Sequence, residues 1–250
     1  MLIPKPDKKK AAEKIIVALD VDNEKKASAL VKELSPLISF FKVGMKLYTA
    51  CGPRIITVLK KLGIKIFLDL KFHDIPNTVA ATAEVVTRLG VEMFNIHLSG
   101  GRKMIRATVE AARETANKKG LPVPTILGVT VLSSFDEKML KEITGAGSLE
   151  EHVVRLALLG RDNGLDGVVA SPREIGLIRK KCGPEFLTVT PGVRPLWASL
   201  DDQSRVLTPR QAFDAGADYL VMGRPIIAHP SPLEAVQKIL IEIQGTNQQN

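Results

Sequence analysis

The sequence predicts an α/β protein that consists of a single (β/α)8 TIM barrel, and three observations support this prediction. Eight apolar, β-branched segments follow one another, amphipathic stretches lie between nearly all of them, and no Ser/Gly-rich linker or change in composition interrupts the series. Alternating strands and helices indicate parallel strands joined by crossover helices. Eight repeats in 250 residues match a barrel better than an open doubly wound sheet. No G-x-G-x-x-G follows the first strand, which weakens the dinucleotide-binding alternative.

The strand candidates are short apolar runs bounded by Gly, Pro or polar residues. They span residues 14–21, 40–45, 64–71, 93–99, 125–132, 165–170, 186–191 and 218–223. We expect residues 14–242 to form the barrel. A basic, flexible tail is expected at residues 1–13 and a polar tail at residues 243–250.

Helices between the strands are predicted by apolar residues at the i, i+3, i+4 and i+7 spacing of one buried face. This spacing occurs at Ala27, Leu30, Val31 and Leu34, and again at Ile105, Val109, Ala112 and Ala116. A hydroxyl N-cap followed by Pro, with Glu or Gln at the third helical position, predicts a capping box that starts a helix. That pattern begins at Ser171, Thr208 and Ser231.

Composition narrows the classes of function. The excess of 35 Lys and Arg over 27 Asp and Glu, a net charge of +8, suggests an anionic partner such as a phosphate ester or a nucleic acid. Aromatic residues make up only 4%, so few platforms exist for stacking on single-stranded nucleic acid. No run approaches the roughly 18 apolar residues of a membrane span, and the N-terminus lacks the apolar region of a signal peptide. Isolated Cys51 and Cys182 indicate reduced, structural thiols in a cytoplasmic protein.

The stretch 64–78 shows how charges are placed at the end of a strand. Its apolar strand runs into Asp69 and Lys71, and Asp74 follows in the loop. On an ideal strand Asp69 and Lys71 share a face about 6 to 7 Å apart. A D-x-K pair taken alone is more often a structural ion pair than a functional site.

Neighbouring strands change that interpretation. Asp20 ends the first strand and Lys42 lies near the end of the second, so three strands contribute ionisable side chains. A barrel interior normally contains bulky aliphatic residues, and active sites of these barrels lie at the C-terminal ends of the strands. We therefore predict a functional site there. His73 and His97 are given no role, and no His, Cys, Asp and Glu residues have the spacing of a metal site.

Two loops predict a phosphate site. Pro191-Gly192-Val193-Arg194 and Gly223-Arg224 follow the seventh and eighth strands, where barrels often bind phosphate. Arginine donates two parallel bonds to a phosphate, and glycine lets backbone N–H groups approach its oxygens. The long segment 196–205 contains Trp197 and Gln203. Either this segment is a mobile lid over the phosphate, or Trp197 packs on the rim of the barrel.

Five strings, read in order, resemble the orotidine 5′-phosphate decarboxylase family. They are V-A-L-D at 17–20, F-K-V-G at 41–44, D-L-K-F-H-D-I-P-N-T at 69–78, V-T-P-G-V-R-P at 189–195 and V-M-G-R-P at 221–225. The resemblance covers residues 14 to 240. It implies a (β/α)8 barrel that forms a homodimer with active sites at the interface, and conversion of orotidine 5′-phosphate to UMP and carbon dioxide without metal or coenzyme.

The resemblance also implies roles for individual residues. Lys71 matches the proton-donating lysine, flanked by Asp69 and Lys42, whereas Asp74 matches an aspartate supplied by the partner subunit together with Thr78. The other matching positions are Asp20 for the ribose hydroxyls, Arg194, Gln203, Gly223 and Arg224 for the phosphate, and Ser133 for the pyrimidine, where many bacterial relatives have Thr.

The expected chemistry suits these residue types. Loss of carbon dioxide leaves a carbanion in the plane of the ring, which the ring π system stabilises poorly. A fixed ammonium at Lys71 would stabilise that charge and then deliver the proton.

Two other classes stay open. A sugar-phosphate decarboxylase or hexulose-phosphate synthase of the same barrel group uses a D-x-K-x-x-D pattern with magnesium, although Lys42 and the I-P-N-T string favour a metal-free pyrimidine site. A non-catalytic nucleotide- or RNA-binding protein would use the positive charge, but the low aromatic content and the charges placed at strand ends disfavour it.

Overall fold

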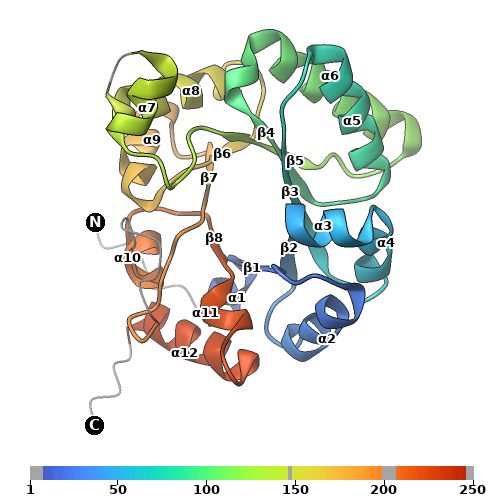
Figure 1. Cartoon of the computed structure of the whole chain (residues 1–250), viewed down its shortest axis with the longest axis vertical. Helices are drawn as coiled ribbons and strands as arrows, with labels where there is room; N and C mark the ends of the chain where they lie inside the picture. Colours follow the sequence, from blue (N-terminus) through green and yellow to red (C-terminus); the bar gives the residue numbers. More distant parts are fainter. Residues whose placement is uncertain (1–7, 146–147, 199–206, 246–250) are drawn as a thin grey trace. The chain divides into compact units, whose positions relative to one another are not determined.

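The computed structural model describes residues 8–145, 148–198 and 207–245. Within these residues, eight strands form a closed barrel in chain order, so the predicted TIM barrel is confirmed (Figure 1). The strands are β1 (Ile15–Ala18), β2 (Phe40–Gly44), β3 (Lys65–Phe72), β4 (Met93–His97), β5 (Thr125–Val129), β6 (Gly167–Val169), β7 (Leu187–Thr190) and β8 (Tyr219–Met222).

Helices follow the strands, as the crossover pattern predicts. The α-helices are α1 (Lys8–Glu13), α2 (Glu24–Leu34), α3 (Met45–Cys51), α4 (Arg54–Lys60), α5 (Pro76–Arg88), α6 (Gly101–Lys119), α7 (Glu137–Thr144), α8 (Leu149–Arg161), α9 (Ile175–Cys182), α10 (Pro209–Asp214), α11 (Arg224–Ile227) and α12 (Pro232–Gln244). Short 3-10 turns lie at Leu98–Gly100 and Pro172–Glu174. None of these described helices is long and apolar enough to cross a membrane.

Internal contacts divide the chain into two compact units. The first unit comprises residues 1–69 and 190–250, and the second comprises residues 70–189. In the first unit β1 pairs in parallel with both β2 and β8, where Val17 lies opposite Phe41 and Met222. All three side chains are buried, and α2 covers this core with Ala27, Val31 and Leu34. The first predicted helix face is therefore confirmed at three of its four positions.

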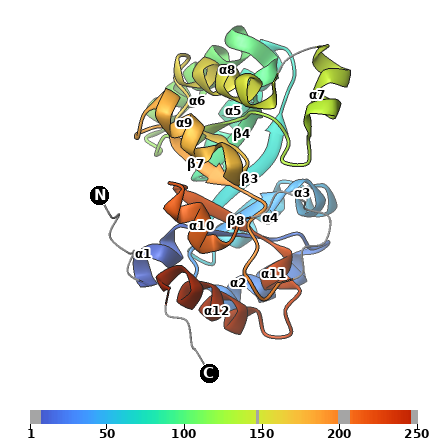
Figure 2. The same cartoon turned by 90° about the vertical axis from the view of Figure 1, so that its left-hand side faces the viewer.

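The N-terminal boundary differs from the expected one. Residues 8–13 were expected to belong to a flexible tail, but they form helix α1, which packs beside α12 (Figure 1). Figure 2 shows the same two helices side by side after a turn of 90°. Ala11 is fully buried and Ala12 nearly so, so burial of these methyl groups stabilises the helix despite its lysines. At the other end α12 continues beyond residue 242, because Ile243 is fully buried.

The second unit contains β4 to β7 and the helices from α5 to α9. Its predicted helix face on α6 is confirmed, because all four of its apolar residues are buried: Ile105, Val109, Ala112 and Ala116. Helix α6 packs against α5.

Two of the three predicted capping boxes have the expected bonds to Glu or Gln. The Thr208 N–H donates to Gln211 Oε1 at 3.0 Å, and the Ser171 N–H donates to Glu174 Oε2 at 3.0 Å. Ser231 precedes α12 as predicted, but its side chain makes no capping hydrogen bond. Glu234 instead pairs with Lys238 one turn later at 2.9 Å, so the third prediction was right about the helix start and wrong about the cap.

Candidate functional site

In the first unit, the loop after β1 and the strands β2 and β3 bring together three of the predicted residues. Nζ of Lys42 lies 3.1 Å from Oδ2 of Asp69 and 3.5 Å from Oδ1 of Asp20. Lys42 and Asp69 are only 11% and 12% exposed at their side chains, whereas Asp20 is 49% exposed. Removing charges from water is costly unless they are paired, and here one ammonium has two carboxylates. The strand ends therefore carry a buried charge network that is open to solvent on the Asp20 side.

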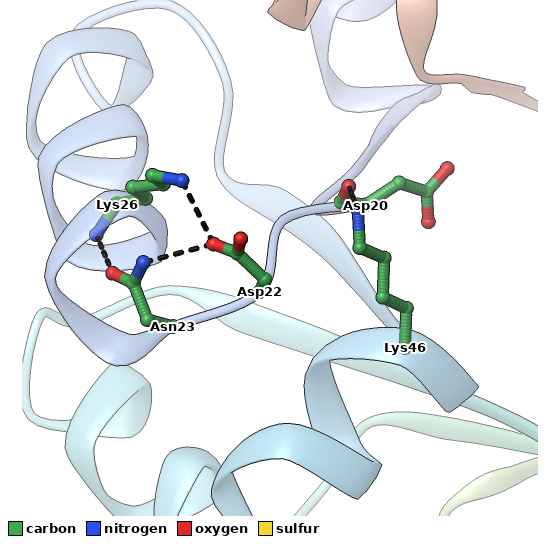
Figure 3. Close-up of polar contacts among 5 residues, drawn as sticks. All are labelled: Asp20, Asp22, Asn23, Lys26 and Lys46. Carbon is green, nitrogen blue, oxygen red and sulfur yellow. Dashed lines mark hydrogen bonds and ion pairs between the residues drawn. The ribbon is translucent and has the colours of Figure 1, made fainter.

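The loop after β1 holds Asp20 through its main chain. Lys46, in the first turn of α3, donates from Nζ to the backbone carbonyl of Asp20 at 3.4 Å, as Figure 3 shows. The Asp20 carboxylate points away from the neighbouring pair of Asp22 and Lys26, whose atoms lie 2.9 Å apart. Lys26 lowers the pKa of Asp22. Sequence reasoning missed Lys46, although its place directly after β2 was a usable signal.

Lys71, the predicted proton donor, lies near the end of β3 with an unusual backbone. Its φ of 53° is the one positive value found at a non-glycine residue in the described parts of the chain. For a residue with a side chain this left-handed conformation costs about 1 to 2 kcal/mol. Strain of this kind gathers at functional sites. The regular β conformation is therefore interrupted at Lys71, within β3.

Asn95 stabilises that conformation of Lys71. Its Oδ1 accepts the Lys71 N–H at 2.8 Å, and Asn95 is fully buried on β4. An amide buried within an otherwise apolar strand needs a hydrogen-bond partner. The sequence showed Asn95 near a strand end, but nothing in the pattern pointed to Lys71.

The turn after β3 exposes Asp74 and Thr78 to solvent. Oδ1 of Asp74 accepts the Ile75 N–H at 2.6 Å, and Thr78 lies in the first turn of α5. Ile75 is 67% exposed, although exposing a large aliphatic side chain to water is unfavourable. Before this turn the His73 ring lies 5.5 Å from that of His97, centroid to centroid. The turn and the start of α5 therefore expose a carboxylate, a hydroxyl and an apolar side chain to solvent.

Ser133 lies in the loop after β5 and is half-buried. In the same unit a cavity of about 1090 Å³ is lined by His97 at the end of β4, by Ser99 and Thr130 directly after β4 and β5, and by apolar residues of α7 and α8. Ser133 is not among its lining residues.

The predicted phosphate residues lie in the first unit. Arg194 is 7% exposed, and its N–H donates to the carbonyl of Leu207 at 3.0 Å. Gly223 is half-buried and Arg224 is exposed at the start of α11. Gln203 lies outside the described residues, as does most of the predicted lid.

Trp197 packs on other residues of the first unit. Its ring meets the His229 ring edge-on, with centroids 5.5 Å apart, and Lys238 Nζ lies 5.8 Å from its centroid. The neighbouring Leu196 N–H donates to Oε2 of Glu242 at 3.3 Å. Burial raises the pKa of the Glu242 carboxyl, although that hydrogen bond acts in the opposite direction. These contacts favour the interpretation that Trp197 packs on the rim of the barrel.

The possible metal ligands and the cysteines of the described residues do not suggest a further site. The described residues include no cluster of three or more His, Cys, Asp or Glu side chains placed to hold a metal ion. Cys182 is buried, which raises the pKa of its thiol, and Cys51 is half-buried.

Comparison with known proteins identifies relatives along nearly the whole chain. Residues 13–239 match the model of the "Orotidine 5'-phosphate decarboxylase / HUMPS family". The chain is 52% identical over 235 residues to the orotidine 5′-phosphate decarboxylase of Moorella thermoacetica, covering 94% of this chain and 93% of that protein. It is 50% identical over 236 residues to the enzyme of the same name from Syntrophomonas wolfei, covering 94% and 99%.

Solved structures agree with these relatives. The orotidine 5′-phosphate decarboxylase of Lactobacillus acidophilus superposes with a TM-score of 0.81 at 36% identity, covering 92% of this chain and 99% of that one. An uncharacterized conserved protein from Geobacillus kaustophilus gives 0.80 at the same identity and the same coverage. The family match thus extends over the barrel strands and all of the described candidate residues.

Proposed function

Because the chain belongs to the orotidine 5′-phosphate decarboxylase / HUMPS family, we propose that it converts orotidine 5′-phosphate to UMP and carbon dioxide. The relatives of about 50% identity bear the first of the two names in the family's title. The structural observation that carries the proposal is the buried ion pair of Lys42 and Asp69. On β3, Asp69 comes two residues before Lys71, whose backbone is strained. A fixed array of charges is what a reaction through an unstabilised carbanion requires.

In the proposed reaction the bond between C6 and the carboxylate breaks, and its electron pair stays on C6. Carbon dioxide leaves, and the Lys71 ammonium transfers a proton to C6, which yields UMP. The neutral amine regains its proton from water. Lys42 and Asp69 preorganise the charges around the reacting atoms, so little reorganisation is needed when the carbanion forms.

We assign the binding of the phosphate, the ribose and the pyrimidine to other predicted residues. Arg194 and Arg224 bind the phosphate, with Gly223 and Gln203, and binding of this remote group supports the chemical step. The half-exposed Asp20 carboxylate accepts hydrogen bonds from the ribose hydroxyls, and the Ser133 hydroxyl contacts the pyrimidine. The 49% exposure of the Asp20 side chain leaves its oxygens accessible to such a ligand.

The protein is further proposed to act as a homodimer, in which Asp74 and Thr78 complete the site of the partner subunit. Both residues are exposed, and the adjacent Ile75 is 67% exposed. Val85, on the same helix as Thr78, is 48% exposed. Burying apolar side chains against a second copy would remove them from water.

The decisive experiment follows the absorbance of orotidine 5′-phosphate during incubation with the purified protein in EDTA. We expect turnover to UMP with undiminished rate after removal of divalent metal. The competing activity is that of a sugar-phosphate decarboxylase or hexulose-phosphate synthase of the same barrel group, which would use magnesium. Inactivity toward orotidine 5′-phosphate, together with magnesium-dependent turnover of a hexulose phosphate, would overturn the proposal.

A further inference from the structure

We propose that Gly44 is a positioning residue for the Lys42 ammonium, because the missing side chain at position 44 leaves the space that this ammonium occupies. A methyl group on Cα of Gly44 would lie 2.8 Å from Nζ of Lys42 and 3.7 Å from Oδ1 of Asp20. Side-chain carbons essentially never approach another heavy atom within 3.0 Å. The ammonium therefore lies too close to this position for a residue with a side chain to fit without displacing it.

The requirement for glycine is one of space and not of backbone conformation. Gly44 has φ of −96° and ψ of −178°, an extended conformation that any residue adopts. It ends β2, where it lies opposite Asp69 in the parallel register with β3. Gly44 thus lies beside both partners of the 3.1 Å Lys42–Asp69 contact.

A second glycine borders the same charge network. A methyl group on Gly223 would lie 3.2 Å from Oδ2 of Asp20 and 3.4 Å from Cβ of Ala18. The Asp20–Lys42 pair is thus flanked by glycines at the ends of β2 and β8. Gly223 already has a proposed phosphate role, so Gly44 is the position that tests the inference cleanly.

Substitution of Gly44 by Ala should separate folding from activity. Ordinary contact begins at 3.4 Å, so the ammonium must withdraw by about half an ångström. Nζ is the far end of a flexible side chain, so the chain accommodates this shift at little cost in stability. Catalysis is less tolerant, because misplacing a catalytic group by about 1 Å costs on the order of 100-fold in rate.

The test compares Gly44→Ala with Gly176→Ala, a control in α9 whose added methyl group meets no heavy atom within 4 Å. We expect Gly44→Ala to lower kcat about 10- to 100-fold with a melting temperature within a few degrees of wild type. Gly176→Ala should leave kcat unchanged. Wild-type kcat in Gly44→Ala would overturn the inference, and so would a loss of activity that merely follows unfolding.

The comparison of kcat values rests on the proposed function. A second measurement tests the inference without relying on turnover. A crystal structure of Gly44→Ala should show Lys42 Nζ displaced, with its distance to Asp69 longer than the present 3.1 Å. An ammonium in its original place would overturn the inference. If the wild-type protein did not decarboxylate orotidine 5′-phosphate, the proposed function would fail while this structural test still applied.

Discussion

Nζ of Lys42 lies 3.1 Å from Oδ2 of Asp69, and the two side chains are only 11% and 12% exposed. Replacing Lys42 by Met would leave a buried carboxylate with one fewer cation. We expect the free energy of unfolding to fall by about 3 kcal/mol, the usual cost of breaking a buried pair. Urea denaturation measures this change.

The matched control for that prediction is the exposed pair of Lys26 and Asp22, whose atoms lie 2.9 Å apart. Lys26→Ala should lower the free energy of unfolding far less than Lys42→Met, because solvent screens exposed pairs. Equal effects of the two substitutions would show that burial does not strengthen the Lys42–Asp69 interaction.

Lys71 is expected to be essential to turnover, and its positive φ is expected to lower the stability of the protein. Lys71→Ala and Lys71→Gly should both lower kcat by about 1,000-fold or more, since each removes the proton donor. Lys71→Gly should be the more stable variant by about 1 kcal/mol, because glycine adopts positive φ without a steric penalty. Steady-state kinetics and urea denaturation provide the two readouts.

Lys65 offers the control for Lys71, because it begins the same strand and is exposed. Lys65→Ala should retain wild-type kcat. Near-wild-type turnover in Lys71→Ala would remove the residue from the proposed mechanism, and equal stability of the alanine and glycine variants would contradict the strain attributed to φ of 53°.

Arg224 is expected to act in binding. Arg224→Ala should raise KM for orotidine 5′-phosphate about 10- to 100-fold, since a hydrogen bond to a charged group contributes about 1.5 to 3 kcal/mol. Arg54→Ala is the control, because Arg54 is an exposed arginine that pairs with Glu24 at 3.6 Å. If KM and kcat of Arg224→Ala matched those of this control, the phosphate assignment would be incorrect.

Sharing of Asp74 between subunits predicts complementation between two inactive proteins. Lys71→Ala and Asp74→Asn, mixed in equal amounts and allowed to exchange subunits, should regain about a quarter of wild-type activity. Half of the dimers would then be mixed, and each mixed dimer would contain one intact site. No recovery after proven exchange would mean that Asp74 serves its own subunit.

The raised pKa of Glu242 predicts that the stability of the protein depends on pH. Burial raises the pKa of its carboxyl above the ordinary value of 4.5, so the folded state binds the proton more tightly than the unfolded state. The stability that this proton contributes is complete below pH 4.5 and is lost as the pH rises through the folded pKa. Glu242→Gln, which stays neutral, should therefore raise the melting temperature at pH 8 and leave it unchanged at pH 4.

Glu234, on the same helix, is the control with the opposite sign. Lys238 lowers the pKa of Glu234, so its contribution to stability is present at neutral pH and is lost as the pH falls through the folded pKa. Glu234→Gln should slightly lower the melting temperature at pH 8. If both variants changed the melting temperature at pH 8 in the same direction, the assignment of their pKa shifts would be contradicted.

The barrel was predictable from the sequence because β-branched runs and their boundaries are local signals. Strands β2, β4 and β5 begin at the expected residues 40, 93 and 125. The first strand was predicted to reach residue 21, but β1 ends at Ala18, before the loop that carries Asp20. Charged residues next to an apolar run do not reveal where the ladder of hydrogen bonds stops.

The site was predictable in its residue types and less so in its geometry. The pairing of Lys42 with Asp69 follows from neighbouring strand ends, which the order of the strands already implies. The turned backbone at Lys71 could not be predicted, because lysine disfavours positive φ and the buried Asn95 that accepts its N–H lies on another strand. The space at Gly44 likewise depends on how far the Lys42 side chain reaches in three dimensions.

The ladder between β1 and β8 has a consequence for synthesis of the protein. Strand β1 is translated first, yet its partner β8 is completed only at Met222. At about 5 to 20 residues per second, the edge of β1 that pairs with β8 waits roughly 10 to 40 s. The segment Ile15–Ala18 is wholly apolar, and an unpaired apolar edge is prone to bind other chains. Nascent chains that stall before β8 should therefore depend on chaperones more than the finished protein does.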